Sequence, residues 1–195
     1  MTRPARTGTS GNLMACQEGA IAPVRTPDAL VATINLFRAY AASLDVDLFY
    51  QNFEAEMVAM PGKYAPPMGE LLLARFADGT PVGCVGLRPI EPDGCCEMKR
   101  LYVSPDGRGS GLGKRLVAAV VREAERVGYR EMRLDTLPSM SQAIGLYRKC
   151  GFEDMEPYYD TPVIGTVFMR RSLRSPLRPE PRRGGLRSAA SSGDR

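Results

Sequence analysis

A glycine-rich turn separates a strand-like segment from an amphipathic helix near the middle of this 195-residue chain. The turn reads SPDGRGSGLG over residues 104–113, and the helical pattern of leucine, alanine and valine that follows it ends at Gly128. Such a turn presents unpaired backbone N–H groups at the positive end of a helix dipole, where anions and above all phosphates bind. The pattern therefore predicts a strand–turn–helix unit with an anion site at the helix N-terminus.

Short strands and helices alternate on both sides of this unit. Apolar spacing and turn residues predict helices over about 28–42, 53–59 and 112–127, and strands at about 20–24, 71–75, 81–87, 95–103, 131–135, 152–155 and 163–169. The residues SMSQ at 139–142 match a capping box that starts at Ser139, and they predict a further helix that ends at Gly151. No internal repeat is visible, so the sequence predicts one mixed α/β domain.

Charge is distributed unevenly along the chain. Residues 1–14 carry a net charge of +2 and residues 172–195 carry +4, so the stretch between them carries −2 of the total of +4. The C-terminal stretch has few large apolar residues with which to offset the entropy of ordering. We therefore expect a domain over 15–171, a disordered N-terminal tail over 1–14 and a basic disordered C-terminal tail over 172–195. Without interleaved aromatic residues or a folded reading motif, the basic tail favours a solvated segment over a nucleic-acid partner.

Hydropathy and cysteine usage indicate the compartment. No apolar run approaches the roughly 20 residues that cross a bilayer, and the N-terminus lacks the apolar stretch of a secretory signal. The five cysteines are odd in number and show no C-x-x-C spacing. We therefore expect reduced thiols, a cytoplasmic location and no membrane partner.

The chain contains no histidine, which removes several kinds of chemistry. Ser-His-Asp and Cys-His nucleophile pairs are excluded, and so are metal sites that rely on imidazole. Acid–base chemistry near neutral pH must then use carboxylates, phenols, amines, thiols or water. We expect no metal site.

Two common phosphate-binding patterns do not fit the glycine turn. A Walker A loop needs glycine where Arg108 stands and serine or threonine where Arg115 stands. A dinucleotide-binding G-x-G-x-x-G pattern needs glycine where Leu112 or Lys114 stands. The turn therefore belongs to another class of anion site.

What the turn does fit is R-x-x-G-x-G, as Arg108-Gly-Ser-Gly-Leu-Gly113, followed downstream by LYRKCGF at 146–152. With these two elements the chain resembles the GNAT superfamily of acyl-CoA-dependent N-acyltransferases over about residues 21–171. The resemblance implies an α/β fold with a mixed, mostly antiparallel central sheet flanked by helices. It also implies an N-acetyltransferase that moves an acetyl group from acetyl-CoA, its co-substrate, to a primary amine by direct attack.

The resemblance assigns the cofactor-binding residues to the glycine turn and to the strand before it. Backbone amides of the turn would hold the pyrophosphate, Arg108 and Lys114 would add charge, and the pantetheine arm would pair with the strand. The implied set is Leu101, Tyr102, Val103, Arg108, Gly109, Ser110, Gly111, Leu112, Gly113 and Lys114. Met98 has one strand parity and Leu101 and Val103 the other, which indicates either a β-bulge between them or simple solvent alternation.

The resemblance also names two catalytic candidates. Tyr147 matches the family's general acid for the departing thiolate, although a core tyrosine is the plainer interpretation. Glu97 stands where some members carry the general base, with a water path as its alternative and Cys96 and Asp135 as lesser candidates. In one departure from the family pattern, Met140 stands where many members carry an asparagine that contacts the cofactor.

The acceptor amine is the part that the sequence does not identify, whether a small molecule or a protein. Aromatic and acidic residues of the early helices and the late hairpin suit an amine or simply pack beneath loops: Phe49, Tyr50, Phe53, Glu54, Tyr64, Tyr158, Tyr159 and Asp160. A homodimer is left open. The alternative function is a non-catalytic acyl-CoA-binding or sensing domain, which the presence of both catalytic candidates disfavours.

Overall fold

The computed structural model describes residues 20–44, 46 and 52–173, and the predicted tails lie mostly outside these ranges. Within them a seven-stranded sheet has the order β1-β2-β3-β4-β5-β7-β6, in which β4 and β5 are parallel and the other neighbours antiparallel. The strands are β1 (Ala20–Pro23), β2 (Glu70–Arg75), β3 (Pro81–Ile90), β4 (Cys95–Val103), β5 (Glu131–Thr136), β6 (Glu153–Asp154) and β7 (Val167–Ser172). This mixed, mostly antiparallel sheet confirms the predicted fold class.

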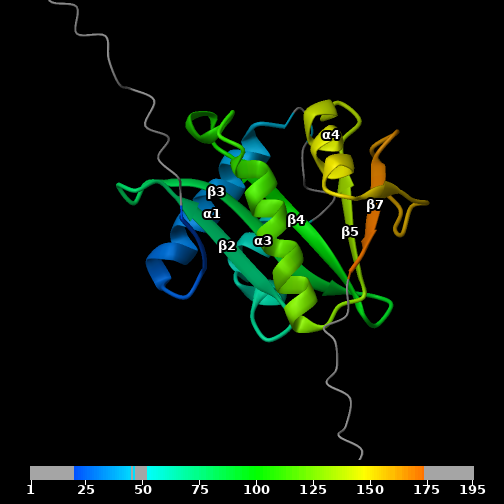
Figure 1. Cartoon of the computed structure of the whole chain (residues 1–195), viewed down its shortest axis with the longest axis horizontal. Helices are drawn as coiled ribbons and strands as arrows, with labels where there is room; N and C mark the ends of the chain where they lie inside the picture. Colours follow the sequence, from blue (N-terminus) through cyan, green and yellow to red (C-terminus); the bar gives the residue numbers. More distant parts are fainter. Residues whose placement is uncertain (1–19, 45, 47–51, 174–195) are drawn as a thin grey trace, which may run out of the picture.

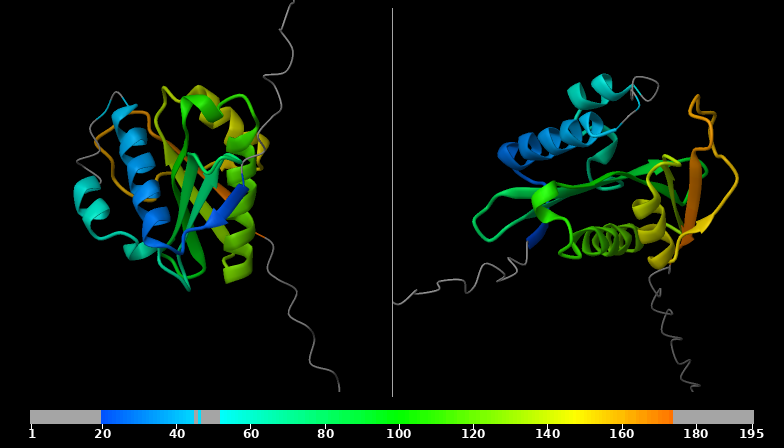
Figure 2. Two further views of the ribbon diagram at one scale, coloured as in Figure 1. Left: turned by 90° about the vertical axis from the view of Figure 1, so that its left-hand side faces the viewer. Right: turned by 90° about the horizontal axis from the view of Figure 1, so that it is seen from above.

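Helices cover both faces of the sheet (Figures 1 and 2). α1 (Pro27–Ala42) and α2 (Phe53–Val58) pack on one face, and α3 (Leu112–Val127) and α4 (Ser141–Lys149) on the other. Short 3₁₀ turns at Gly62–Tyr64 and Pro105–Gly107 complete the described elements. Each face has its own apolar core, and the larger one lies beneath α3 and α4. No helix in the described ranges is long and apolar enough to cross a membrane.

Local signals in the sequence set the helix ends. The Thr26 side chain accepts the backbone N–H of Ala29 at 3.2 Å, and Pro27 occupies the first turn of α1. α3 ends at Gly128, whose φ of 101° is the left-handed conformation that glycine adopts without strain. The predicted helix starts hold within a residue for α1, α2 and α3.

A β-bulge interrupts β4, as one of the two sequence interpretations predicted. Gly86 of β3 pairs with Lys99 and Cys84 pairs with Tyr102, so the two residues between them, Arg100 and Leu101, oppose a single residue of β3. Arg100 has a φ of 57°, which a bulge accommodates. The bulge reverses the face of the strand, so that Met98 and Leu101 both pack on the core beneath α3.

β4 and β5 pair over only part of their length. The parallel register joins Cys95–Glu97 to Glu131–Arg133, and it does not extend to the later residues of either strand. Beyond Glu97 the backbone edge of β4 is therefore not paired with β5. This separation opens the middle of the sheet at the end where the glycine turn begins.

Three predicted boundaries need correction. The capping box does not start at Ser139: Met140 is the N-cap of α4, without a side-chain hydrogen bond, because Ser139 still lies in the preceding turn. The last strand starts at Val167 rather than 163, since the segment before it forms turns. The domain also extends past 171, because β7 runs through Ser172 and Leu173 is buried in the larger core.

Candidate active site

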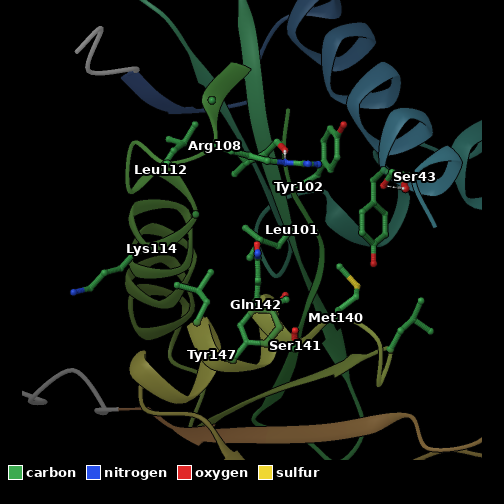
Figure 3. Close-up of a pocket in the computed structure, with 18 of the residues that line it drawn as sticks. Ser43, Leu101, Tyr102, Arg108, Leu112, Lys114, Met140, Ser141, Gln142 and Tyr147 are labelled. Atoms are coloured by element: carbon green, nitrogen blue, oxygen red, sulfur yellow. Dashed lines mark hydrogen bonds between the residues drawn. The ribbon is translucent and has the colours of Figure 1, made fainter. Parts of the chain in front are cut away.

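A cleft of about 770 Å³ opens where β4 and β5 separate, within the size range of cofactor and small-molecule sites. Its walls come from the end of α1, the last three residues of β4, the glycine turn with the start of α3, and α4 with the turn before it. Figure 3 shows these elements converging around Leu101. The strand–turn–helix unit that the sequence singled out therefore forms one side of the cleft.

The glycine turn presents backbone N–H groups to this cleft. Gly109 and Gly111 have φ values of 79° and 77°, and no atom lies within 4 Å of the place where a Cβ would stand. Glycine is favoured there by its backbone conformation and by the room that it leaves for a ligand in the cleft. Crowding within the fold does not require it. Gly111 is the N-cap of α3 and makes no side-chain cap, so the first-turn N–H groups stay open to an anion.

The predicted cofactor residues differ in whether they line the cleft and in where their side chains point. Leu101, Tyr102 and Val103 line the cleft, as do Arg108, Gly109, Gly111, Leu112, Gly113 and Lys114. Arg108 extends toward Tyr102 and donates its Nε to the Val103 carbonyl at 3.2 Å. Lys114 points away from the cleft (Figure 3). Ser110 is outside the lining, and its hydroxyl donates to the Gly107 carbonyl at 2.7 Å.

Tyr147 lies on the opposite wall, in α4. Its ring packs edge-on against Phe152 at a centroid distance of 6.0 Å, and the side chain is buried. Burial raises the pKa of its phenol well above the usual value, and the nearby Tyr40 and Asp135 raise it further. A phenol that stays protonated at neutral pH is a proton donor, so the predicted acid role and the core-packing interpretation are compatible in one side chain.

The turn before α4 and the first residues of α4 form a further part of the wall. Ser139, Met140, Ser141 and Gln142 all line the cleft, and Gln142 points toward Leu101 (Figure 3). Gln142 therefore brings a carboxamide to the wall from which the family's usual asparagine is missing.

A second cavity, of about 30 Å³, adjoins the cleft beside Tyr147. It shares Tyr40, Leu44, Leu101, Leu137 and Tyr147 with the cleft, and it extends between Met98–Arg100 of β4 and Asp135–Thr136 of β5. We call it the inner cavity. Its floor is polar because the sheet face opposite α3 carries the charged side chains of both strands here.

Lys99 and Asp135 form a buried ion pair at the inner cavity, with Nζ and Oδ1 2.6 Å apart. Burial by itself raises the pKa of Asp135, but the attraction and hydrogen bond of Lys99 outweigh it and hold that pKa below its usual value. Asp135 was a lesser candidate in the sequence. The structure places it closer to the cleft than Glu97.

Glu97 is buried below the inner cavity and lines neither cavity. Its carboxylate accepts hydrogen bonds from Arg88 at 2.7 Å and from the Tyr158 hydroxyl at 2.6 Å, while Lys99 Nζ lies 3.9 Å away. Glu97 is 1% exposed although it lies near the start of β4, because the segment after β6 covers it with Tyr158. A base role for Glu97 would have to act through these neighbours.

The aromatic residues proposed for an acceptor divide into two groups. Phe53 and Tyr64 are core residues under α1 and α2, and Tyr64 packs directly against Gly86. Tyr158 and Tyr159 form an edge-on cluster with Phe168. Phe49 and Tyr50 lie outside the described residues. The plainer interpretation, packing, therefore holds for the first group.

The residues that line the cleft suit an acyl-CoA. Open N–H groups at the start of α3 and the Arg108 guanidinium suit phosphates, and the backbone edge of β4 beyond Glu97 is free of β5. Apolar side chains of β4 and α4 line the remainder together with polar residues at the end of α1 and the start of α4.

Comparison with known proteins agrees with this arrangement. Residues 31–152 match the profile of the Acetyltransferase (GNAT) family. An uncharacterized N-acetyltransferase of Schizosaccharomyces pombe is 42% identical over 154 residues, which cover 79% of this chain and 94% of the relative. An uncharacterized N-acetyltransferase of Dictyostelium discoideum is 28% identical over 71% of this chain and 92% of its own.

Solved structures share the fold. A GNAT-family acetyltransferase of Staphylococcus aureus superposes with a TM-score of 0.66 at 19% identity, covering 80% of this chain and all of the other. A phosphinothricin acetyltransferase of Sinorhizobium meliloti, solved in complex with AcCoA, gives a TM-score of 0.64 at 20% identity, covering 87% and 96% of the two chains. With the sequence matches, these likenesses show that the chain is an acyltransferase of the GNAT family.

Proposed function

We propose that this protein transfers the acetyl group of acetyl-CoA to a primary amine by direct attack. The observation that carries the proposal is the cleft itself, which joins open N–H groups at the start of α3 to the buried phenol of Tyr147. The first end suits the phosphates of a coenzyme A, and the second suits a departing thiolate. Acetyl-CoA supplies the acetyl group as an activated thioester.

Residues of the chain have distinct tasks in this proposal. The backbone of Gly109–Gly113 and the Arg108 side chain bind the phosphates, with Lys114 contributing through its backbone and its charge. The backbone of Leu101–Val103 pairs with the extended arm of the cofactor, and Gln142 faces it from α4. The bulge at Arg100 orients this part of β4 toward the cleft.

The proton balance is simple. A neutral amine attacks the carbonyl carbon, a C–N bond forms, and the C–S bond breaks with its electron pair going to sulfur. Tyr147 gives its hydroxyl proton to that sulfur and regains a proton from the nitrogen, so the products are an N-acetyl amine and a free thiol. No histidine is needed, in keeping with the composition.

Glu97 stays a prediction as the base. Its hydroxyl partner Tyr158 and its neighbour Lys99 are the groups through which it would act. The cytoplasmic location and a homodimer likewise stay predictions. The alternative function, a domain that binds acyl-CoA without turnover, has the same cleft but no use for the Tyr147 hydroxyl.

The experiment that tests the function is a panel of amines with acetyl-CoA, read as release of free thiol. Two relatives that match part of this chain are named for different acceptors. They are an IAA acetyltransferase of Azospirillum brasilense and an aminoglycoside N(6')-acetyltransferase of Stenotrophomonas maltophilia. The panel should therefore span amino acids, polyamines, aminoglycosides and lysine peptides. Amine-dependent thiol release supports the transferase. Binding of acetyl-CoA without release from any amine would favour the non-catalytic domain.

A further inference from the structure

Arg100 has an unusual backbone conformation at the bulge of β4. It is one of two non-glycine residues with a positive φ among the residues that the structure describes, and its φ is 57°. Its carbonyl accepts a hydrogen bond from the buried thiol of Cys84 on β3 at 3.7 Å. The left-handed conformation brings a Cβ close to the backbone carbonyl oxygen, so it persists only where neighbouring groups fix it.

The Arg100 side chain is fixed by α2. Its Nη2 lies 2.7 Å from Oε2 of Glu56 and its Nε lies 3.4 Å from Oε1, so two nitrogens meet the carboxylate. The guanidinium also lies over the ring of Phe53, 5.0 Å from the ring centroid. Only 3% of the Arg100 side chain and 13% of the Glu56 side chain are exposed. This buried ion pair therefore joins the bulge of β4 to α2.

Tyr64 completes the contacts from the side of β3. Its hydroxyl donates to Oε1 of Glu56 at 2.6 Å, and its side chain is buried. Its ring packs on Gly86 so closely that a Cβ there would stand 2.6 Å from a ring carbon. Gly86 pairs with Lys99, the residue before Arg100. The four side chains that make these contacts are called the Arg100 clamp: Phe53, Glu56, Tyr64 and Arg100.

The bulge decides which way the next residues of β4 face. In a regular strand Met98 and Leu101, three positions apart, would point to opposite faces of the sheet. The bulge lets both pack on the core beneath α3, and Leu101 also lines the cleft. Loss of the bulge would turn Leu101 to the other face and shift the backbone groups of the following residues by one position.

We propose that Arg100 and Glu56 are positioning residues for the pantetheine arm of acetyl-CoA. Their ion pair holds the bulge, and the bulge presents the backbone of Leu101–Val103 to the cleft. The inference rests on the proposed function, in which that backbone pairs with the arm. It makes α2 part of the cofactor site, although no residue of α2 lines the cleft.

The clamp should act on one half of the cofactor. The nucleotide half would bind at the glycine turn and the start of α3, and α3 packs on the face of the sheet opposite α2. Adenosine 3',5'-bisphosphate corresponds to this half and lacks the arm. Loss of the clamp should therefore weaken acetyl-CoA selectively, by about tenfold in Kd if one or two hydrogen bonds to the arm are lost.

The test measures Kd for both ligands by calorimetry in two double variants. Glu56→Gln with Arg100→Ala removes the clamp without leaving a carboxylate unpaired, and alanine disfavours a positive φ. Glu56→Gln with Arg100→Gly removes the same side chain, but glycine adopts this φ readily. We expect Kd for acetyl-CoA to rise about tenfold with alanine and to return toward its original value with glycine. Kd for the bisphosphate should stay within about twofold in both variants.

Arg25 and Glu70 provide a matched control. Glu70 is 1% exposed and accepts Nη1 of Arg25 at 2.7 Å, and neither residue is among those that line the cleft. Glu70→Gln with Arg25→Ala removes a comparable pair, so it should lower Tm and leave both Kd values unchanged. If the variant with Arg100→Ala does not fold, Arg100→Lys is measured instead, since lysine keeps the charge but cannot meet the carboxylate with two nitrogens.

Selective loss of acetyl-CoA affinity, with recovery in the glycine variant, supports the inference. Equal weakening of both ligands would overturn it, because the clamp would then stabilise the domain as a whole. Unchanged Kd values, or equal losses with alanine and with glycine, would also overturn it, since the bulge conformation would not be what the arm requires. Amine turnover is a separate measurement: if the protein binds acetyl-CoA but acetylates no amine, the proposed transfer fails while these Kd values still decide the inference.

Discussion

The two sides of the active site use different kinds of polar group. On the cofactor side, the turn and first residues of α3 offer mainly backbone N–H groups, held within seven consecutive residues at 107–113. On the inner side, the polar groups are side chains that meet from distant parts of the sequence. Lys99 and Asp135 are 36 positions apart, and Glu97 and Tyr158 are 61 apart.

This difference explains what each side can do. A backbone site tolerates variation in most side chains and binds a constant ligand, a phosphate chain, in one way. A side-chain network can change its charge balance with single substitutions, so single variants there perturb the site more. We expect variants on the first side to affect binding of acetyl-CoA, and variants on the second to affect stability and the transfer step.

The largest expected effect is on the cofactor side. In the unaltered protein, acetyl-CoA at a hundredfold excess over its Kd should stabilise the fold by about 2.7 kcal/mol. Gly111→Asp adds a negative side chain at the N-cap of α3 and should abolish that stabilisation, read as a shift of Tm. Gly79→Asp is the matched control, because Gly79 has a similar φ of 88° and open surroundings but lies in a hairpin turn. If acetyl-CoA shifts the Tm of Gly111→Asp and of Gly79→Asp equally, the start of α3 is not the cofactor side of the site.

Tyr147→Phe should have the next largest effect. It removes a proton donor and keeps the ring that packs on Phe152, so kcat should fall by about 10²–10⁴-fold while acetyl-CoA binding persists. Tyr129→Phe serves as control, since its hydroxyl donates to the Met68 carbonyl at the far end of α3. A Tyr147→Phe variant that keeps more than about half of the original kcat would mean that water supplies the proton.

Glu97→Gln should mainly weaken the fold. The substitution leaves the Arg88 guanidinium, whose side chain is 25% exposed, without its counter-charge, and breaking this pair costs up to about 3 kcal/mol of unfolding free energy. Asp154→Asn, which breaks an exposed pair with Arg148, should cost less than about 1 kcal/mol. Urea unfolding measures both. A Glu97→Gln variant of normal stability but with kcat lowered mainly toward acid pH would restore Glu97 as the base.

Acid should weaken the inner side by a smaller amount. Burial raises the pKa of Glu56, but hydrogen bonding and attraction by Arg100 outweigh it and leave that pKa lowered, as Lys99 does for Asp135. Carboxylates with a lowered pKa contribute stability that is present above their unfolded pKa, near 4, and is lost as pH falls through the folded value. Unfolding free energy measured between about pH 5 and pH 2 should therefore decline, and less steeply in Glu56→Gln. Equal slopes would show that Arg100 does not act on Glu56 in this way.

The contrast between the cofactor side and the inner side also decides how much of the site the sequence could predict. The glycine turn, the amphipathic α3 and the parity change near Met98 are local patterns, so they predicted the strand–turn–helix unit and one interpretation gave the bulge correctly. The capping box at 139–142 failed because Ser139 still lies in the preceding turn, and Met140 is the N-cap of α4 without a side-chain hydrogen bond.

The inner side had no local pattern to find. The residues next to Glu97 in the sequence do not predict that Arg88 and Tyr158 enclose it, because these two residues lie on β3 and on the segment after β6. Asp135 looked ordinary for the same reason: its importance depends on the place where β4 and β5 separate. Pairings across a sheet follow from register, which a single sequence specifies only weakly for charged residues.

Mass analysis of the products tests directly whether this cleft transfers an acetyl group to an amine. Acetyl-CoA and an amine that responds in the panel are incubated with the protein and with Gly111→Asp. We expect one N-acetyl amine for each free thiol formed by the unaltered protein, and neither product above background with the variant. Thiol release without an acetylated amine, or equal product from Gly111→Asp, would contradict it.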